Sequence, residues 1–413
     1  MPKKTAILAG IRLEENEQEF SAAMEETASL CHACGIEVVS RITQASRSPD
    51  PETAFRRGKF HELCAMAKEL DVDLIIFHNP LRIIVAQRIS AEAGVNVIDR
   101  TALILDIFAD RARSRQAKLQ VELARLQYDL PRVLQSSADE SGHERGGSAY
   151  NRGAGEMRSS LVQRRYSQRM AQLKKEIEKI KKQKYQDERR RTRTMMRRAA
   201  LIGYTNAGKS SLMNAMIEMG EGQGKHVYEE DMLFATLDTS VRMIPWASRK
   251  FLLYDTVGFV SDLPHTLVDA FQATLDAARD ADLLIHVIDG SDPQWQRKAD
   301  ISEDTLKQIG AGDIPVMRVF TKSDLMEEIP DDGMIHVSSL TRAGMDQMMD
   351  TVLERLYPDE SRIRCLVPYD KMSAVSEYRS VLLMKTIEET EEGVIFEISG
   401  PSRYTDAFRS MQI

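Results

Sequence analysis

Cysteine is scarce in this sequence, and long apolar runs are absent from it. Four cysteines among 413 residues cannot form the disulfide framework of a small secreted protein, so they favour a reducing compartment. No run approaches the ~20 apolar residues that a membrane-spanning helix needs. The apolar stretch near the N-terminus ends at Arg12 and is too short for a secretory signal. We therefore expect a cytoplasmic protein without a membrane span, which can associate with a membrane only peripherally.

Charge is unevenly distributed along the chain. The formal net charge of −7 by itself argues against a polyanionic partner. Residues 111–198, however, carry 24 Lys and Arg against 10 Asp and Glu, a charge of +14, and the remainder carries 32 against 53, a charge of −21. This asymmetry favours contact between the basic segment and nucleic acid over the alternative, a solvated charged surface.

The basic segment also has a helical pattern. Apolar and small residues recur at spacings of four and three, which is typical of a coiled-coil seam. One series is Leu105, Ala109, Ala112, Gln116, Leu119, Leu123, Leu126 and Leu130, and the other is Tyr166, Met170, Leu173, Ile177 and Ile180. Residues 135–156 between them are rich in Gly and Ser and predict a flexible loop. We expect a basic helical hairpin, the arm, over 111–198.

The residues before the arm predict an N-terminal α/β domain over 1–110 with a parallel sheet, because strand-like and helical runs alternate there. The expected strands are 5–11, 36–42, 73–77 and 95–98, and the expected helices are 15–34, 58–70 and 82–93. Cys31, Cys34, His61 and Cys64 could form a zinc site, or the first two a redox site. The favoured alternative is that these residues pack on helix faces. Length allows two or three domains, and the 42% of apolar residues excludes wholesale disorder.

From residue 199 the chain has the strand–loop–helix pattern of a phosphate-binding P-loop. Backbone N–H groups of such a loop surround the phosphates, and the following helix directs its positive end at them. The motif is Gly203, Tyr204, Thr205, Asn206, Ala207, Gly208, Lys209 and Ser210, followed by Ser211. Lys209 can reach the β- and γ-phosphates, and Ser210 can ligate Mg²⁺.

Two later motifs favour GTP as the nucleotide. Asp255–Gly258 follows an apolar strand and reads D-x-x-G, in which Asp255 would hold Mg²⁺ through water and the Gly258 N–H would sense the γ-phosphate. Thr321–Asp324 follows another strand; Asp324 can accept two hydrogen bonds from guanine, and Lys322 would lie along the base. Their order, about 50 and 115 residues beyond the P-loop, makes them specific together. Thr236, preceded by Phe234 and Ala235, fits the switch threonine that ligates Mg²⁺ with GTP bound.

These motifs resemble the HflX family, ribosome-associated GTPases of the translation-factor class, over almost the full length. Further strings that carry the resemblance are Val97–Thr101, Leu130–Arg132 and Asp262–His265. The resemblance implies a GTPase that uses Mg²⁺, with Lys209, Thr236 and Gly258 at the reacting phosphate. It also implies binding to the large ribosomal subunit and its rRNA, and splitting or rescue of stalled ribosomes under stress. The alternative is an RNA-binding GTP switch that acts in subunit assembly or as a chaperone. Nothing argues for an obligate oligomer.

The sequence departs from the family pattern at three places. Gly153–Ser160 replaces G-P-G-E-T-Q-L-E, so the arm tip is expected to contact its target differently. Thr321 replaces Asn, which we expect to weaken a hydrogen bond that links the guanine motif to the P-loop. Ser338, Ser339 and Leu340 stand in place of S-A-K, and the Ser339 N–H could still meet the guanine carbonyl. Apart from these departures, Phe259 stands where Ras-type enzymes carry a water-orienting Gln, so intrinsic hydrolysis should be slow.

The expected architecture is therefore α/β throughout. A Ras-like P-loop GTPase domain over 199–358 follows the arm. The residues 359–413 alternate strand-like runs with short helical stretches, which predicts a small α+β C-terminal domain.

Overall fold

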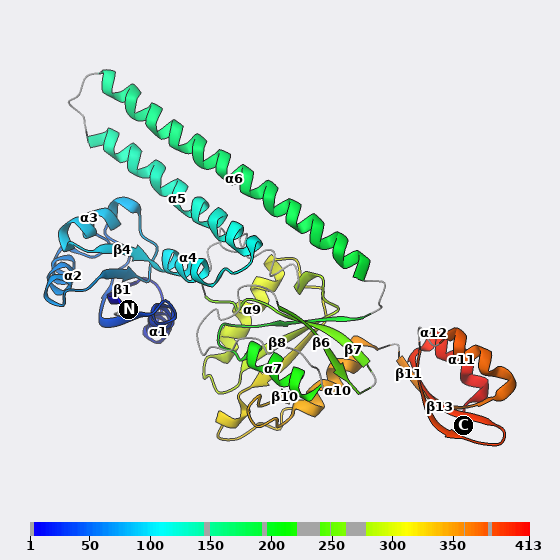
Figure 1. Ribbon diagram of the computed structural model, residues 1–413. Helices are drawn as coiled ribbons and strands as arrows, with labels where there is room; N and C mark the ends of the chain where they lie inside the picture. The colour runs from blue at the N-terminus through cyan, green and yellow to red at the C-terminus, as the bar shows by residue number, and fades with distance from the viewer. Residues whose placement is uncertain are drawn as a thin grey trace.

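The structure is a computed structural model, and Figure 1 shows how its elements are arranged. It describes residues 4–143, 149–191, 196–220, 240–247, 249–261, 278–358, 360–378 and 382–413. Three sheets and a long helical hairpin follow one another along the chain. The α/β fold with a parallel N-terminal sheet is confirmed.

The N-terminal domain is a four-stranded parallel sheet in the order β2-β1-β3-β4. Its strands are β1 (Lys4–Arg12), β2 (Ile36–Ala45), β3 (Leu74–Phe77) and β4 (Asn96–Asp99). Its helices are α1 (Glu17–Ala33), α2 (Arg57–Glu69), α3 (Ile83–Ala93) and α4 (Arg100–Arg111). Side chains alternate between the faces of β1, so Ala6 and Leu8 enter one core and Ile7 and Ala9 the other.

The zinc alternative is wrong for a geometric reason. Cys31 packs in the core that contains Ala6 and Leu8, whereas Cys64 packs in the core on the opposite face of the sheet. The two thiols therefore cannot share a metal ion. Burial also raises the pKa of Cys31 to about 12, which keeps this thiol protonated and unreactive.

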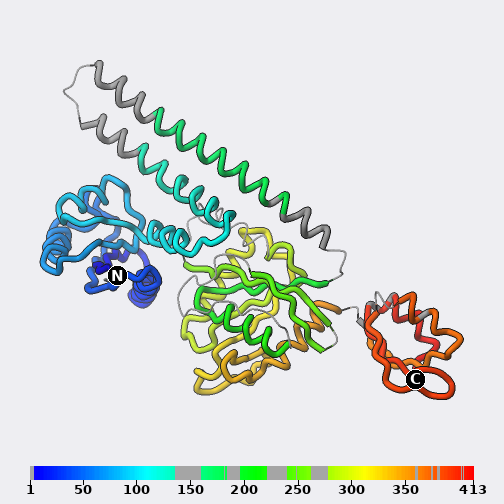
Figure 2. The backbone as a smooth tube through the Cα atoms, viewed as in Figure 1, coloured from blue at the N-terminus to red at the C-terminus, as the bar shows by residue number. Residues whose placement is uncertain are grey.

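The arm is an antiparallel pair of helices, α5 (Arg115–His143) and α6 (Ala149–Arg191), which project together in Figures 1 and 2. With 43 residues, α6 is about 64 Å long. Leu123 of α5 packs against Leu173 and Ile177 of α6. The predicted seam is confirmed for this part of the arm.

Two details of the predicted arm are wrong. The first heptad series is not one helix: α4 ends at Arg111, and the Ser114 hydroxyl accepts a hydrogen bond from the Ala117 N–H at 3.1 Å and so caps a new helix. Most of the expected loop 135–156 is helical, because α5 continues through residue 143 and α6 begins at 149. Gly and Ser lower helix stability by only about 1 kcal/mol or less each, which does not end a helix.

Asp99 joins the arm to the N-terminal domain. It is buried at the end of β4, and its carboxylate caps α4 by accepting a hydrogen bond from the Ala102 N–H at 3.0 Å. The same carboxylate accepts hydrogen bonds from the Tyr128 hydroxyl and Arg132 Nη2 of α5, both at 2.7 Å. The middle of α5 is therefore fixed to the start of α4.

The GTPase domain is a six-stranded sheet in the order β10-β9-β8-β5-β7-β6, parallel except for β6. The strands are β5 (Arg198–Ile202), β6 (Ser240–Trp246), β7 (Arg249–Asp255), β8 (Leu283–Asp289), β9 (Val316–Thr321) and β10 (Ile335–His336). Helices α7 (Lys209–Met219) and α10 (Met345–Leu356) cover one face, and α9 (Trp295–Gln308) lies on the other. That second face shares one continuous core with α1, α4 and α5.

The C-terminal residues form the predicted combination of strands and short helices. Strands β11 (Glu360–Pro368), β12 (Leu383–Glu389) and β13 (Gly393–Pro401) make an antiparallel sheet in the order β11-β13-β12. Helices α11 (Met372–Tyr378) and α12 (Ser402–Thr405) accompany it. None of the helices in the described part of the chain is long and apolar enough to cross a membrane.

The buried Asp99 should contribute strongly to stability. Asp99→Ala leaves Arg132 and the Tyr128 hydroxyl without their buried acceptor, so we expect the free energy of unfolding to fall by about 2–3 kcal/mol. Urea unfolding followed by circular dichroism measures this. Asp110→Ala, at an exposed position of the same helix, is the matched control. Equal unfolding curves for the two variants would contradict the assigned role of Asp99.

Candidate nucleotide-binding site

The P-loop lies between β5 and α7, at the edge where the parallel strands β5, β7, β8 and β9 end. Gly203 has a φ of 145°, and a Cβ there would lie 2.2 Å from the Val287 carbonyl oxygen. Gly208 has a φ of 84° and is the N-cap of α7. Gly203 is thus required by the close approach of the Val287 carbonyl, and Gly208 by its left-handed backbone conformation.

Lys209 points back along the loop. Its ammonium donates hydrogen bonds to the carbonyl oxygens of Gly203 at 3.1 Å and Tyr204 at 2.7 Å. Burial lowers the pKa of Lys209 to about 8, partly offset by the charge of Asp255. Phosphate oxygens beside this lysine would favour its charged form, as the proposed role requires.

Ser210 and Asp255 meet at the end of β7. The Ser210 hydroxyl donates a hydrogen bond to the Asp255 carboxylate at 2.9 Å. The Ser210 hydroxyl is an oxygen ligand of the kind that Mg²⁺ prefers, and the Asp255 carboxylate beside it could hold a water of the ion's shell. These residues therefore fit the expected Mg²⁺. Phe234, Ala235 and Thr236 lie outside the described residues.

The D-x-x-G segment lies directly on the P-loop. The Phe259 N–H donates to the Gly203 carbonyl at 3.0 Å, and the Thr205 N–H donates to the Phe259 carbonyl at 2.7 Å. A Cβ on Gly258 would be 2.7 Å from the Thr205 Cα, a backbone atom that cannot move aside, and 2.8 Å from Lys209 Nζ, so only glycine fits there. This places Gly258 beside the phosphate-binding lysine. The Phe259 ring is 1% exposed and packs in the shared core, so it offers nothing to an attacking water.

The guanine motif is tied to the P-loop. The Thr321 hydroxyl lies 2.7 Å from the Ala207 carbonyl oxygen and 3.0 Å from that of Ile288, and its single proton can be donated to either. The guanine motif is therefore linked to the P-loop with Thr321 in place of Asn, because the hydroxyl reaches the loop; that this link is weaker than one from Asn stays a prediction. Lys322 has a left-handed backbone, and its ammonium pairs with Asp289 at 2.8 Å.

Ser338 orients the Asp324 carboxylate, which the motif assigns to guanine recognition. Its hydroxyl donates a hydrogen bond to Asp324 Oδ1 at 2.6 Å, which leaves the second oxygen for a base. Ser339 follows on the same loop, where its backbone could meet the guanine carbonyl. The structure thus places Thr321, Asp324 and Ser338 with the P-loop in one region, as the motifs predict.

Sequence reasoning missed the residues that contact this site from the N-terminal domain. The Tyr204 hydroxyl of the P-loop donates a hydrogen bond to Glu26 of α1 at 2.7 Å, and Arg100 of α4 reaches Ser261 at 3.3 Å. The available signal was the charged pair Asp99-Arg100 directly after a buried strand, since strand ends in parallel sheets carry functional groups.

Comparison with known proteins gives consistent matches along the chain. Three family models match in succession: GTP-binding GTPase N-terminal over residues 21–109, GTP-binding GTPase Middle Region over 111–191, and 50S ribosome-binding GTPase over 198–322. The GTPase HflX of Caldanaerobacter subterraneus subsp. tengcongensis is 35% identical over 372 residues, 89% of this chain and 84% of the relative. The GTPase HflX of Escherichia coli is 35% identical over 343 residues, 81% of this chain and 79% of the relative.

Among solved structures, a GTP-binding protein from Sulfolobus solfataricus in complex with GDP is similar to this chain. It is 25% identical, the match covers 86% of this chain and 98% of that protein, and the TM-score is 0.45.

The geometry around Asp324 predicts the base preference. In Asp324→Asn an amide donor opposes the guanine N1–H and amine, so we expect GTP affinity to fall about 100-fold and affinity for xanthosine triphosphate to rise. Fluorescence titration with both nucleotides measures this. Asp331→Asn, an exposed carboxylate of the same domain, should bind GTP as the wild type does. A GTP affinity of Asp324→Asn within about threefold of the control would exclude Asp324 from base recognition.

Proposed function

The chain belongs to the HflX family of GTPases, and from that premise we propose that it engages the large ribosomal subunit and splits or rescues stalled ribosomes. In this proposal, GTP and Mg²⁺ occupy the site described above, with Mg²⁺ held by Ser210 and Thr236. Binding to the ribosome stimulates GTP hydrolysis, and the protein is monomeric away from the ribosome. The observation that carries the proposal is the match of residues 198–322 to the model of a 50S ribosome-binding GTPase, in a chain that also has a basic arm.

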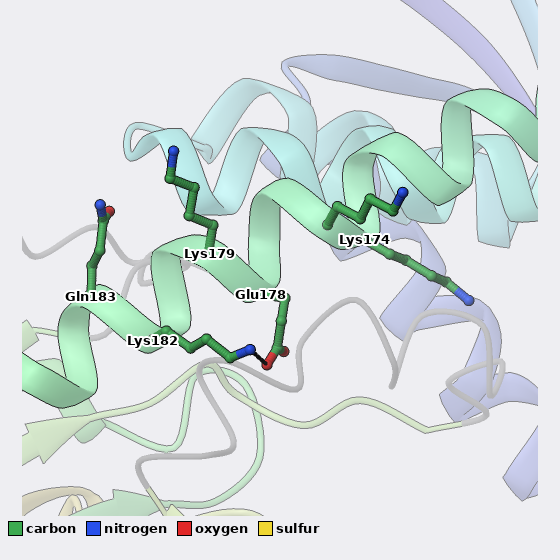
Figure 3. A pocket seen from close by; sticks show the side chains of 6 residues that line it. Lys174, Glu178, Lys179, Lys182 and Gln183 are labelled. Atoms are coloured by element: carbon green, nitrogen blue, oxygen red, sulfur yellow. Dashed lines mark ion pairs between the residues drawn. The ribbon is translucent and has the colours of Figure 1, made fainter.

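The charge of the arm supports an RNA partner. Lys174, Lys175, Lys179 and Lys182 line a recess along α6, which Figure 3 shows. Glu178 is the acidic residue of that lining, and its ion pair with Lys182 at 3.6 Å is exposed and therefore weak. The recess thus retains a net positive charge that can neutralise phosphates.

The surroundings of Phe259 support a ribosome-stimulated reaction. Its ring is buried, and a phenyl group neither orients nor deprotonates water. The ribosome would then reposition the switch segments or supply the missing group. Slow hydrolysis by the isolated protein keeps the GTP-bound form available until it meets its target.

Sedimentation through sucrose tests this function. The full chain is mixed with intact ribosomes or separated subunits, with a non-hydrolysable GTP analogue or with GDP. With the GTP analogue bound, we expect the protein to co-migrate with large subunits and intact ribosomes to be lost. With GTP, we expect faster phosphate release when large subunits are added. Co-migration without loss of intact ribosomes would favour the assembly or chaperone alternative. Fast hydrolysis that large subunits do not change would contradict ribosome stimulation.

The lysines of the recess give a sharper prediction. Replacing Lys174, Lys175, Lys179 and Lys182 with Ala should weaken large-subunit binding by about tenfold or more and flatten its salt dependence, because fewer counterions are released. Binding measured at several salt concentrations checks this. A matched variant neutralises four exposed lysines elsewhere: Lys250, Lys307, Lys371 and Lys385. If both variants lose the same affinity, net charge and not the arm surface determines binding.

A further inference from the structure

A buried polar cluster joins the N-terminal domain to the P-loop. It consists of Glu26 of α1, Arg100 of α4, Tyr204 of the P-loop and Ser261, which follows the D-x-x-G segment. The Arg100 and Glu26 side chains are 6% and 15% exposed and form an ion pair at 3.1 Å. A buried charge is costly unless it is paired, so this pair strongly restricts how the two domains meet.

Glu26 binds two parts of the nucleotide site at once. Its Oε1 accepts a hydrogen bond from the Tyr204 hydroxyl at 2.7 Å, and its Oε2 accepts one from the Ser261 hydroxyl. The Tyr204 hydroxyl in turn accepts a hydrogen bond from the Ser261 N–H at 2.7 Å. Burial, with the nearby Glu26 charge, raises the pKa of Tyr204, so the phenol stays protonated and donates.

Residues 256–261 contain Gly258 and Phe259, and hydrogen bonds hold this segment at both ends. At its start, the Thr256 hydroxyl donates to the Leu201 carbonyl at 2.6 Å. At its end, Ser261 is held by Glu26 and Arg100. Between them, Phe259 pairs with the P-loop backbone. Among these described contacts, only the one at Ser261 is made by residues outside the GTPase domain, namely Glu26 and Arg100.

We propose that Glu26 and Arg100 are positioning residues for the GTPase site, which hold residues 257–261 on the P-loop and thereby favour GTP over GDP. The inference rests on the nucleotide site proposed above. Gly258 lies beside Lys209, where a γ-phosphate would contact both the lysine and the Gly258 N–H. Without the pair, the segment can lift from the P-loop, and a contact that only GTP makes is lost.

The positioning pair is also connected to the arm. Arg100 directly follows Asp99, whose carboxylate holds Tyr128 and Arg132 of α5. Both residues lie at the start of α4, so a displacement of α5 that moves Asp99 also moves Arg100. The nucleotide preference and the position of the arm are thereby coupled through one helix end.

Nucleotide titration of the full chain tests the inference. Affinities for a non-hydrolysable GTP analogue and for GDP are measured for Glu26→Gln, which puts an amide donor where one of the two Glu26 oxygens accepts a hydrogen bond from Tyr204 or Ser261, and which removes the counter-charge of Arg100. We expect affinity for the analogue to fall about tenfold and that for GDP to change less than about twofold. Equal losses for both nucleotides, or no loss, would overturn the proposal.

The controls separate the inference from the site on which it rests. Glu25→Gln is matched in sequence and helix, but Glu25 pairs with Arg41, away from the P-loop, and should bind both nucleotides like the wild type. Lys209→Ala should abolish binding of both; if it does not, the nucleotide site itself is wrong. If Glu26→Gln does not fold, Ser261→Ala decides the question, because it removes the same anchor: an unchanged ratio of the two affinities then overturns the inference.

Discussion

Two adjacent buried charges at the start of α4 constrain the arrangement of the whole N-terminal half. Asp99 and Arg100 are both removed from water, and each must find partners there. Asp99 finds them in Tyr128 and Arg132 of the arm, and Arg100 finds them in Glu26 and Ser261. Since breaking such a buried pair is costly, the N-terminal sheet, the arm and the segment beside the P-loop must meet at this helix end.

This constraint is the physical basis of the coupling that we propose between the arm and the nucleotide. The face of the GTPase sheet opposite α7 and α10 shares its core with α1, α4 and α5, and the Phe259 ring lies in that core. A change of the D-x-x-G segment between GTP and GDP therefore acts on packed groups of the other domain. By thermodynamic linkage, a partner that binds the arm in one arrangement changes the relative affinities for the two nucleotides by the same factor.

The sequence predicts those parts of the molecule whose structure is determined by residues close together in the chain. The P-loop is recognisable because Gly203 and Gly208 meet backbone requirements that few residues satisfy, and the N-terminal strands are recognisable by their alternation with helices. The contact between Glu26 and Tyr204 spans 178 positions and leaves no local pattern, so it was not predictable. The hydrogen bond of Thr321 depends on a distance of 2.7 Å to the Ala207 carbonyl oxygen, which residue type alone does not give. Residues 135–143 and 149–156 are helical where a loop is expected, because Gly and Ser lower helix stability by only about 1 kcal/mol or less each.

Hydrogen–deuterium exchange of the full chain, compared between GDP and a non-hydrolysable GTP analogue, tests the coupling between nucleotide and arm most directly. Coupling through the start of α4 predicts that the analogue changes exchange in three places together: residues 257–261, the first turn of α4, and α5 around Tyr128 and Arg132. A change confined to the GTPase domain, with α4 and α5 exchanging equally in both nucleotides, would contradict it.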